Sequence, residues 1–300
     1  MAKDQVIVMG HKISDPDSFG ACMGIYRAAV ALEKKAHIVI NDVSTSIKPL
    51  YDEIAQSSVY GKDIFLTSGG SAGLYFRQRY GRGGRYEQTT DDRVSGTFLK
   101  RSKTIAVLDH HRQSSTVIDN AVLSYIEPYS SSTCEMVAEV LQYIVDDIKV
   151  PSIEADCLYA GIMIDTRNFM NRTGVRTFEA AAYLRRCGAD ITRVRKMFRD
   201  DMESYRAKAE AMRMAEVYRE QYAIAECPSD IASPTVLAAQ TANELLDING
   251  IKASFVLTVY NGRIFLSARS IDEVNVQIIA EKLGGGGHIN QPAHSLNIQT

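Results

Sequence analysis

The sequence predicts an α/β protein of two domains: a parallel sheet with helices on both faces, followed by a smaller mixed α/β domain. Short apolar runs alternate with helical patterns through the first half of the chain, which is typical of parallel strands joined by helices. The length of 300 residues exceeds what one domain usually holds. Polar residues follow several of the apolar runs, at the edge where parallel sheets carry their chemistry.

The elements of the first domain follow from its apolar pattern. Expected strands are QVIVMG (5–10), AHIVIND (36–42) and SKTIAVLDHH (102–111). Expected helices are GACMGIYRAAVALEKK (20–35), SSTCEMVAEVLQYIVDD (131–147) and TFEAAAYLRRCG (177–188). The run EADCLYAGIMIDT (154–166) places Asp165 at the end of an apolar segment, in the position of a strand end. We interpret Asp147 and Asp156, in turn or helical context, as solvated.

The domain boundaries are set where this pattern changes. We assign residues 1–190 to the first domain, 191–221 to a charged helical connector and 222–300 to the second domain. Expected strands of the second domain are YAIAEC (222–227), ASFVLTVYNG (253–262) and RIFLSARS (263–270), with YNGR as a hairpin turn. A glycine cluster in EKLGGGGHINQPAHS (281–295) then follows a helix.

The composition excludes some classes of protein. A net charge of -2 gives no general attraction to nucleic acid or membranes, so an anionic ligand needs a local site. The five cysteines are scattered without metal-finger spacing, which favours reduced thiols in a cytosolic protein. We expect a soluble chain, because we find no signal peptide and no apolar run near the roughly 20 residues of a membrane span.

The segment GHKISDPDSFGA (10–21) offers a compact set of ligands for a hard metal ion. It brings His11, Asp15 and Asp17 together directly after an expected strand. One imidazole and two carboxylates suit Mn²⁺ or Mg²⁺. The ordinary alternative is a helix N-cap cluster, where aspartate is common.

Asp109, His110 and His111 follow another apolar strand. Adjacent residues of a strand point to opposite faces, so the two histidines suit different tasks. One can bind a metal while the other contacts a phosphate, and Asp109 can orient an imidazole. Asp165, alone a structural cap, is credible as the closing ligand of this set.

The run Gly284 to His288 offers consecutive backbone amides without side chains, which is how a chain forms an anion nest. A flexible loop or a helix C-cap is the alternative. Ser267 and Arg269 favour phosphate binding. Two metals and a phosphate nest together describe hydrolysis by in-line displacement, without a serine or cysteine nucleophile.

With these motifs assembled, the chain resembles the DHH/DHHA1 phosphoesterase family, and within it the membrane-anchored cyclic-di-AMP phosphodiesterases. The resemblance is carried by GHKISDPDSFGA, VLDHHR, GIMIDTRNF and the terminal SARS…NVQIIAEKLGGGGH. Four ordered motifs over nearly the whole chain make it specific. In the family, such a unit often follows transmembrane and regulatory segments, and a last strand and helix usually come after GGGGH. Both ends of this sequence look abbreviated by comparison.

The resemblance implies a site with two Mn²⁺ ions, other divalent ions being alternatives. His11 and Asp15 would hold one ion, and Asp17, His110 and Asp165 the other. His111 would touch the scissile phosphate, with Asp109 beside it. The nucleotide would be bound from the second domain by Arg269, Gly285, Gly286, Gly287 and His288. The product would be the linear dinucleotide pApA, and relatives suggest a cytosolic homodimer.

Residues 69–97 depart from the family pattern. The family has an apolar strand there that ends in a metal-bridging aspartate, roughly VVVVDTNRP. This chain has SGGSAGLYFRQRYGRGGRYEQTTDDRVSGT (68–97), in which Asp91 or Asp92 would have to substitute for the missing aspartate although neither follows an expected strand. A solvated loop or an arginine- and glycine-rich RNA-binding tract would also have this composition.

A shift of reading frame accounts for the departure best. With suitable synonymous codons, YGRGGRYEQTTDDRVSG (80–96) read one nucleotide later becomes MVVVVDTNRPRTTECP, which contains the missing motif. We therefore interpret about Gly69 to Gly96 as translated out of frame between two compensating indels. The gene's nucleotide sequence tests this interpretation.

The function expected from the sequence is metal-dependent hydrolysis of cyclic di-AMP. Oligoribonuclease action on short RNA, or phosphatase action on phosphoadenosine phosphate, is the enzymatic alternative. A catalytically impaired nucleotide-binding remnant is the alternative from another class, and the altered segment favours it. An RNA-binding protein that uses RYGRGGRY is the weakest alternative.

Overall fold

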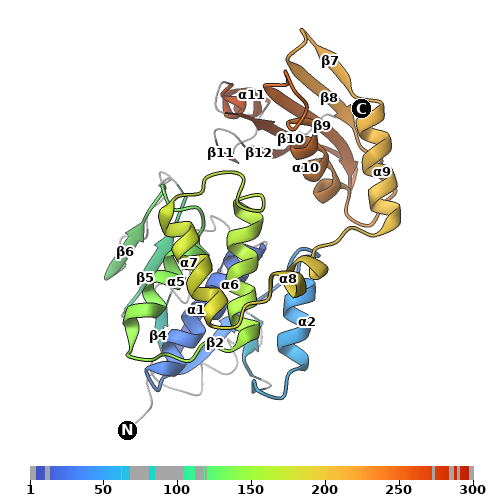
Figure 1. Cartoon of the computed structure of the whole chain (residues 1–300). Coiled ribbons are helices and arrows are strands. Elements are labelled where there is room, and N and C mark those ends of the chain that lie inside the picture. The colour runs from blue at the N-terminus through green and yellow to red at the C-terminus, as the bar shows by residue number, and fades with distance from the viewer. Residues whose placement is uncertain are drawn as a thin grey trace. The chain divides into compact units, whose positions relative to one another are not determined.

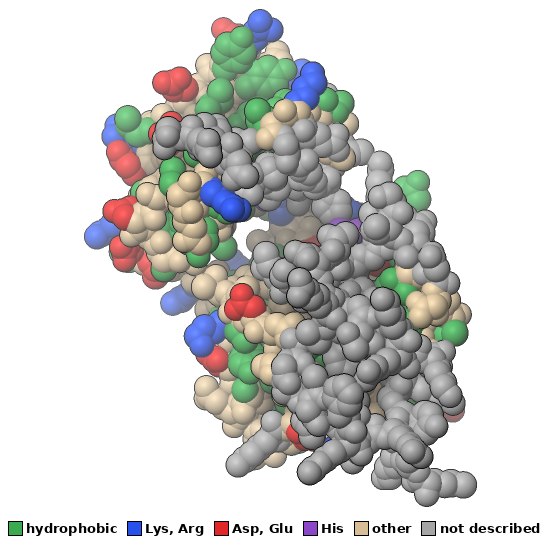
Figure 2. Space-filling model, turned by 180° about the vertical axis from the view of Figure 1, so that it is seen from behind, with side chains coloured by type: hydrophobic (Ala, Val, Ile, Leu, Met, Phe, Trp, Pro, Cys, Tyr) green, Lys and Arg blue, Asp and Glu red, His purple; other side chains and the backbone are tan. Residues whose placement is uncertain are grey.

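The computed structural model describes residues 5–10, 14–61, 63–67, 81–84, 104–111, 118, 120–271, 274–283, 287–288 and 291–296. The chain divides into two compact units, Met1–Phe198 and Arg199–Thr300 (Figure 1). No helix in the described residues is long and apolar enough to cross a bilayer. On the face seen in Figure 2, apolar, acidic and basic side chains are interspersed, in keeping with the small net charge.

The first unit is built on parallel strands, as predicted. β1 (Gln5–Met9), β2 (Lys35–Val39), β3 (Phe65–Leu66) and β4 (Gly81–Gly84) form a parallel sheet in the order β3-β2-β1-β4. β5 (Ala106–Asp109) and β6 (Leu123–Ile126) form a second parallel pair. Four consecutive residues of β2, from Ala36 to Val39, are buried. Since neighbouring side chains point to opposite faces, both faces of this strand are covered.

The helices of the first unit bury a single large core. They are α1 (Pro16–Ala31), α2 (Lys48–Gln56), α5 (Thr133–Ile144), α6 (Ser152–Asp165), α7 (Val175–Arg186) and α8 (Ile191–Met197). Residues of α1, α5 and α6 make up much of this core, together with Val8, Ile38 and Leu108 of the strands. The helical layer in Figure 1 therefore rests on the strands through apolar side chains.

Two glycines let α1 and α6 approach closely. A Cβ on Gly20 would lie 2.3 Å from the carbonyl oxygen of Cys157, and one on Gly161 would lie 2.8 Å from the Cα of Asp17. Neither distance is tolerable for a real side chain, so both positions require glycine. The close approach brings the start of α1 beside α6.

Two expectations for α6 are wrong. The run that ends at Asp165 is a helix rather than a strand-like segment, and Asp165 is its last residue. A helix that is buried on nearly all sides has no polar stripe, so periodicity does not separate it from a buried strand. Asp156 is fully buried rather than solvated, and it accepts hydrogen bonds from the amide of Asp190 (2.7 Å) and from the Arg193 guanidinium.

The second unit is a mixed α/β layer, as predicted. Its sheet has the order β11-β12-β10-β9-β8-β7, in which only the β8–β9 pair is parallel. The strands are β7 (Glu216–Tyr218), β8 (Tyr222–Glu226), β9 (Ala253–Tyr260), β10 (Arg263–Ser270), β11 (Gly287–His288) and β12 (Gln291–Leu296). The helices are α9 (Met202–Arg213), α10 (Pro234–Leu245) and α11 (Val276–Lys282).

The turn predicted at YNGR joins β9 and β10. Asn261 and Gly262 both have positive φ, 50° and 70°, as a two-residue type I′ hairpin requires. The connector expected at 191–221 is not one helix: α8 lies in the first unit, α9 lies in the second, and the start of the sheet follows. Charged helical composition does not reveal a break at residues 198–201.

Candidate metal centre

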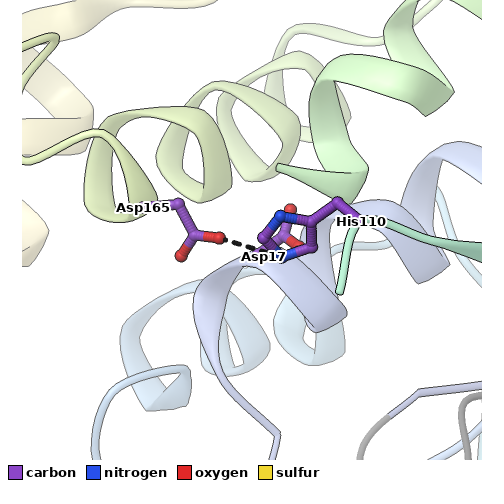
Figure 3. Close-up of side chains that lie close together, drawn as sticks. All are labelled: Asp17, His110 and Asp165. Carbon is purple, nitrogen blue, oxygen red and sulfur yellow. Dashed lines mark ion pairs between the residues drawn. The ribbon is translucent and has the colours of Figure 1, made fainter. Parts of the chain in front are cut away.

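Three of the expected ligands lie together in the first unit (Figure 3). Asp17 comes from the first turn of α1, His110 directly follows β5, and Asp165 ends α6. Nε2 of His110 lies 3.6 Å from Oδ2 of Asp17 and 3.4 Å from Oδ2 of Asp165. One ligand atom from each side chain falls within 4.8 Å of the others, so the three could hold one ion.

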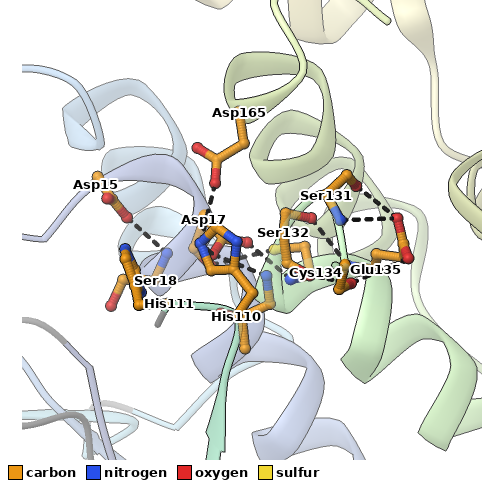
Figure 4. A network of polar contacts seen from close by, with 12 residues as sticks. Asp15, Asp17, Ser18, His110, His111, Ser131, Ser132, Cys134, Glu135 and Asp165 are labelled. Atoms are coloured by element: carbon orange, nitrogen blue, oxygen red, sulfur yellow. Dashed lines mark hydrogen bonds and ion pairs between the residues drawn. The ribbon is translucent and has the colours of Figure 1, made fainter. Parts of the chain in front are cut away.

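The orientation of Asp17 is fixed by the N-terminus of α5 (Figure 4). Its Oδ1 accepts a hydrogen bond from the amide of Cys134 at 2.7 Å, and its Oδ2 accepts one from the amide of Thr133 at 3.0 Å. The first amides of a helix lack partners within the helix and carry its positive dipole end. They therefore hold the carboxylate in one direction.

His110 has the properties of a neutral imidazole ligand. Burial lowers its pKa, and the positive charges of His111 and Arg172 lower it further against the opposing effect of Asp17. Within the described residues, its Nδ1 is buried and has no hydrogen-bond partner. An unprotonated imidazole nitrogen and two carboxylate oxygens that converge in a buried place repel one another. A bound cation would remove that repulsion, so the donor set fits a divalent ion.

The environment of Asp165 also disfavours the charged form of its side chain. Burial raises the pKa of its carboxyl group well above the ordinary value, and the negative charges of Asp17 and Asp15 raise it further. The charges of His111 and Arg172 act in the opposite direction. The raised pKa favours the protonated carboxyl group, whereas a bound metal ion would favour the ionised one.

The other two expected ligands, Asp15 and His11, are not part of this cluster in the described residues. Asp15 caps α1, with its Oδ1 accepting from the amide of Ser18 at 2.7 Å, so the N-cap alternative holds for this residue. Its role as a metal ligand stays a prediction. His11 lies outside the described residues, as do Asp91 and Asp92.

Asp109 orients His111 rather than His110. Its Oδ1 lies 2.7 Å from Nδ1 of His111 and accepts a hydrogen bond from the His111 amide at 2.9 Å. The two histidine rings are tilted by 58° with centroids 4.4 Å apart. The imidazole of His111 is thus held next to the buried ring, with its Nε2 facing away from Asp109.

Sequence reasoning missed the turn after Asp165. Arg167, Asn168 and Phe169 all have positive φ, which costs energy for residues other than glycine. The hydroxyl of Thr166 holds the turn, donating to the carbonyl of Ile162 at 2.7 Å and accepting from the Phe169 amide at 3.0 Å. The polar run DTRNF was the available signal. Arg172 follows this turn.

Residues expected to bind the nucleotide lie in the second unit. Arg269 is on β10, and its guanidinium donates to Oδ1 of Asn243 on α10 at 3.2 Å and to the carbonyl of Ala268 at 2.8 Å. Gly287 and His288 form β11, whose backbone pairs with β12. Gly285 and Gly286 lie outside the described residues.

Comparison with family models finds two matches. Residues 5–162 match the model of the DHH family, N-terminal domain, which is more than half of the chain. Residues 220–291 match the model of the DHHA1 domain.

Similar proteins span almost all of the chain. It is 36% identical over 296 residues to cyclic-di-AMP phosphodiesterase PdeA of Listeria monocytogenes, covering 98% of this chain and 45% of that protein. It is 37% identical over 303 residues to cyclic-di-AMP phosphodiesterase GdpP of Bacillus subtilis, covering 97% of this chain and 45% of that protein. The chain thus spans less than half the length of these relatives.

More distant similarities agree with this grouping. The bifunctional oligoribonuclease and PAP phosphatase NrnA of Mycoplasma genitalium is 28% identical over 198 residues, covering 63% of this chain and 59% of that protein. The crystal structure of an exopolyphosphatase-related protein from Bacteroides fragilis matches with a TM-score of 0.80 at 19% identity, covering 99% of this chain and 88% of that one. At this identity the match speaks for the fold alone.

Proposed function

The chain belongs to the DHH family, and from that premise we propose that it is a metal-dependent phosphodiesterase that hydrolyses cyclic di-AMP to pApA. The relatives named as cyclic-di-AMP phosphodiesterases, at 36% and 37% identity over nearly the whole chain, support the substrate. We propose Mn²⁺ as the metal, a cytosolic location, and a homodimer as the oligomeric state.

The observation that carries the proposal is the convergence of Asp17, His110 and Asp165. Their ligand atoms lie within 4.8 Å of one another in a largely buried place, with no described cation between them. This donor set of two carboxylates and one imidazole suits a divalent ion such as Mn²⁺. His11 and Asp15 are proposed to hold a second ion.

Two such ions, when bound, supply an activated water and neutralise the charge that builds on the phosphoryl oxygens. The protein's own groups position the reactants. His111, whose Nδ1 lies 2.7 Å from Oδ1 of Asp109, is proposed to donate a hydrogen bond to a phosphate oxygen through Nε2 in its protonated form. Arg269 and the backbone from Gly285 to His288 are proposed to bind the remaining phosphate or the base from the second domain.

A catalytically impaired nucleotide binder is the second candidate. The four residues of β4, Gly81 to Gly84, contain one arginine and no apolar side chain, although the strand pairs with β1 in the parallel sheet. Buried parallel strands are normally rich in apolar residues. If the protein is made as written, it lacks the aspartate that the family pattern puts after this strand.

Incubation with cyclic di-AMP and Mn²⁺, followed by chromatography, tests the proposal directly. We expect pApA to form and a chelator to abolish it. Binding of cyclic di-AMP without any product would favour the impaired binder. Faster cleavage of pApA or of short RNA than of cyclic di-AMP would favour the oligoribonuclease alternative, which the similarity to NrnA keeps in consideration.

A further inference from the structure

We propose that Glu135 is a positioning residue for the metal ligand Asp17 and couples it to the segment that follows Asp165. This inference rests on the proposed function, because it concerns the affinity of the same site for its ion. Glu135 does not touch the site. It acts through the start of α5, whose amides hold the Asp17 carboxylate.

Glu135 is a carboxylate in an unusual place. It lies in the first turn of α5, where acidic residues normally face solvent, yet its exposed fraction is 2%. Glutamate is almost never buried to this extent without partners that compensate its desolvation. Here those partners decide where α5 begins.

Three hydrogen bonds fix the loop that leads into α5. Oε1 of Glu135 accepts from the hydroxyl of Ser130 at 3.0 Å, and Oε2 accepts from the hydroxyl and the amide of Ser131 at 2.5 and 3.3 Å. In return, the hydroxyl of Ser132 accepts from the Glu135 amide at 3.0 Å. Glu135 therefore bonds to the loop through both its side chain and its amide. The amides of Thr133 and Cys134, which follow the loop, donate to Asp17 (Figure 4).

A fourth hydrogen bond reaches a distant part of the chain. The hydroxyl of Thr177, in the first turn of α7, donates to Oε2 of Glu135 at 2.7 Å. The same hydroxyl accepts from the amide of Gly174, the N-cap residue of α7, at 3.0 Å. Since α7 follows the turn after Asp165, Glu135 connects the helix whose amides hold Asp17 with the helix that follows Asp165.

A neighbouring contact provides a matched control. One turn further along α5, Glu139 binds the guanidinium of Arg176 on α7 through two hydrogen bonds of 2.6 Å. This pair joins the same two helices. Arg176 also lies 3.9 Å from Glu127 at the start of the loop before α5, but in the described residues Glu139 makes no hydrogen bond to that loop. Its loss should weaken helix packing without moving the amides that hold Asp17.

The affinity for Mn²⁺ distinguishes a role of Glu135 in orienting Asp17 from a role in helix packing alone. We would measure it by calorimetric titration of metal-free protein and follow thermal unfolding of each variant in chelator. We expect Glu135→Gln and Thr177→Val to weaken Mn²⁺ binding about tenfold, as loss of groups that orient metal ligands commonly does. Thr177→Ser keeps the hydroxyl and should keep the affinity, and Glu139→Gln should keep the affinity even where its melting temperature falls.

Thr177→Val and Thr177→Ser decide the matter if Glu135→Gln does not fold. Wild-type affinity in Thr177→Val, or an equal loss of affinity in Glu139→Gln, would overturn the inference. A wild type that binds Mn²⁺ but leaves cyclic di-AMP intact would overturn the proposed function alone, with the affinities still deciding the role of Glu135. A wild type that binds no divalent ion would overturn both.

Discussion

The Oδ2 atom of Asp17 lies 3.6 Å from Nε2 of His110, and both side chains are almost completely buried. The same nitrogen lies 3.4 Å from Oδ2 of Asp165. One imidazole nitrogen can offer a single proton to these two carboxylates, and burial disfavours the charged form of the ring. Without a cation, the proximity of these three groups therefore destabilises this part of the protein. Removal of one carboxylate should stabilise the metal-free protein.

Asp165→Asn should stabilise the metal-free protein while preventing its stabilisation by metal. The substitution removes a carboxyl group whose pKa is raised by burial and by neighbouring carboxylates. We expect a gain of roughly 1 kcal/mol in the free energy of unfolding in chelator. Thermal unfolding with and without Mn²⁺ measures both effects. A variant that is less stable in chelator and is still stabilised by Mn²⁺ would contradict this reading of the cluster.

Mn²⁺ affinity should increase with pH. The raised pKa of Asp165 means that the metal-free site retains a proton above the ordinary range of a carboxyl group, and the ion must displace it. The pKa of His110 is lowered, which favours the neutral imidazole. A proton on His110 therefore competes with the ion less than the proton on Asp165 does. Titration calorimetry at about pH 6 and about pH 8, in buffers of different ionisation enthalpy, reports affinity and released protons. Affinity that is flat with pH, without proton release, would exclude this competition.

Asp109→Asn should lower turnover and spare metal binding. Asp109 holds Nδ1 of His111 at 2.7 Å, so its loss frees the imidazole proposed to contact the phosphate. We expect kcat to fall about 100-fold, a usual contribution of a positioned proton donor. The kcat of His111→Ala should fall by a similar factor, and the kcat of the double variant should fall no further. If Mn²⁺ affinity fell as far as in Asp165→Asn, Asp109 would be a ligand instead.

Replacing YGRGGRYEQT (80–89) by MVVVVDTNRP should raise both stability and metal affinity. Four valines in β4, in place of three glycines and one arginine, would add apolar side chains to a strand of the parallel sheet, at up to about 1.5 kcal/mol for each one that is buried. Arg85→Asp, part of this replacement, would restore the family's bridging carboxylate. The matched control carries Arg85→Asn in the same background and should gain stability but not Mn²⁺ affinity. Equal affinity in the two versions would speak against the bridging role.

The ion pair of Arg27 and Glu154 should contribute far more stability than a surface pair. The Glu154 side chain is fully buried and accepts two hydrogen bonds from Arg27, at 2.6 and 2.7 Å, and one from the hydroxyl of Tyr60 at 2.9 Å. Arg27→Met leaves this carboxylate without its charged partner, so we expect a loss of about 3 kcal/mol.

The exposed pair of Lys48 and Asp52 is the control, and Lys48→Met should cost at most about 0.5 kcal/mol. Urea unfolding measures both variants. A loss from Arg27→Met as small as that from Lys48→Met would show that solvent reaches Glu154.

The sequence by itself determined the fold class, the family and three strands of the second unit, β8, β9 and β10. β10 was predicted residue for residue, because apolar alternation and a short hairpin turn are local signals. The sequence also marked Asp17, His110 and Asp165 as candidate ligands by their polar motifs, and the resemblance to the family grouped these three around one ion. The sequence did not reveal that Asp165 ends a helix, because a helix buried on nearly all sides has no polar face to give it a helical period.

Only the tertiary structure decided how those residues meet. Gly20 and Gly161 allow α1 and α6 to approach closely, and the start of α5 then supplies the amides that hold Asp17. The role of Glu135 could not be read from the chain, since its partner Thr177 is far along the sequence. Local patterns determine elements. Contacts between distant elements depend on packing, which is why the candidate ligands could be named from the sequence and the residues that orient Asp17 could not.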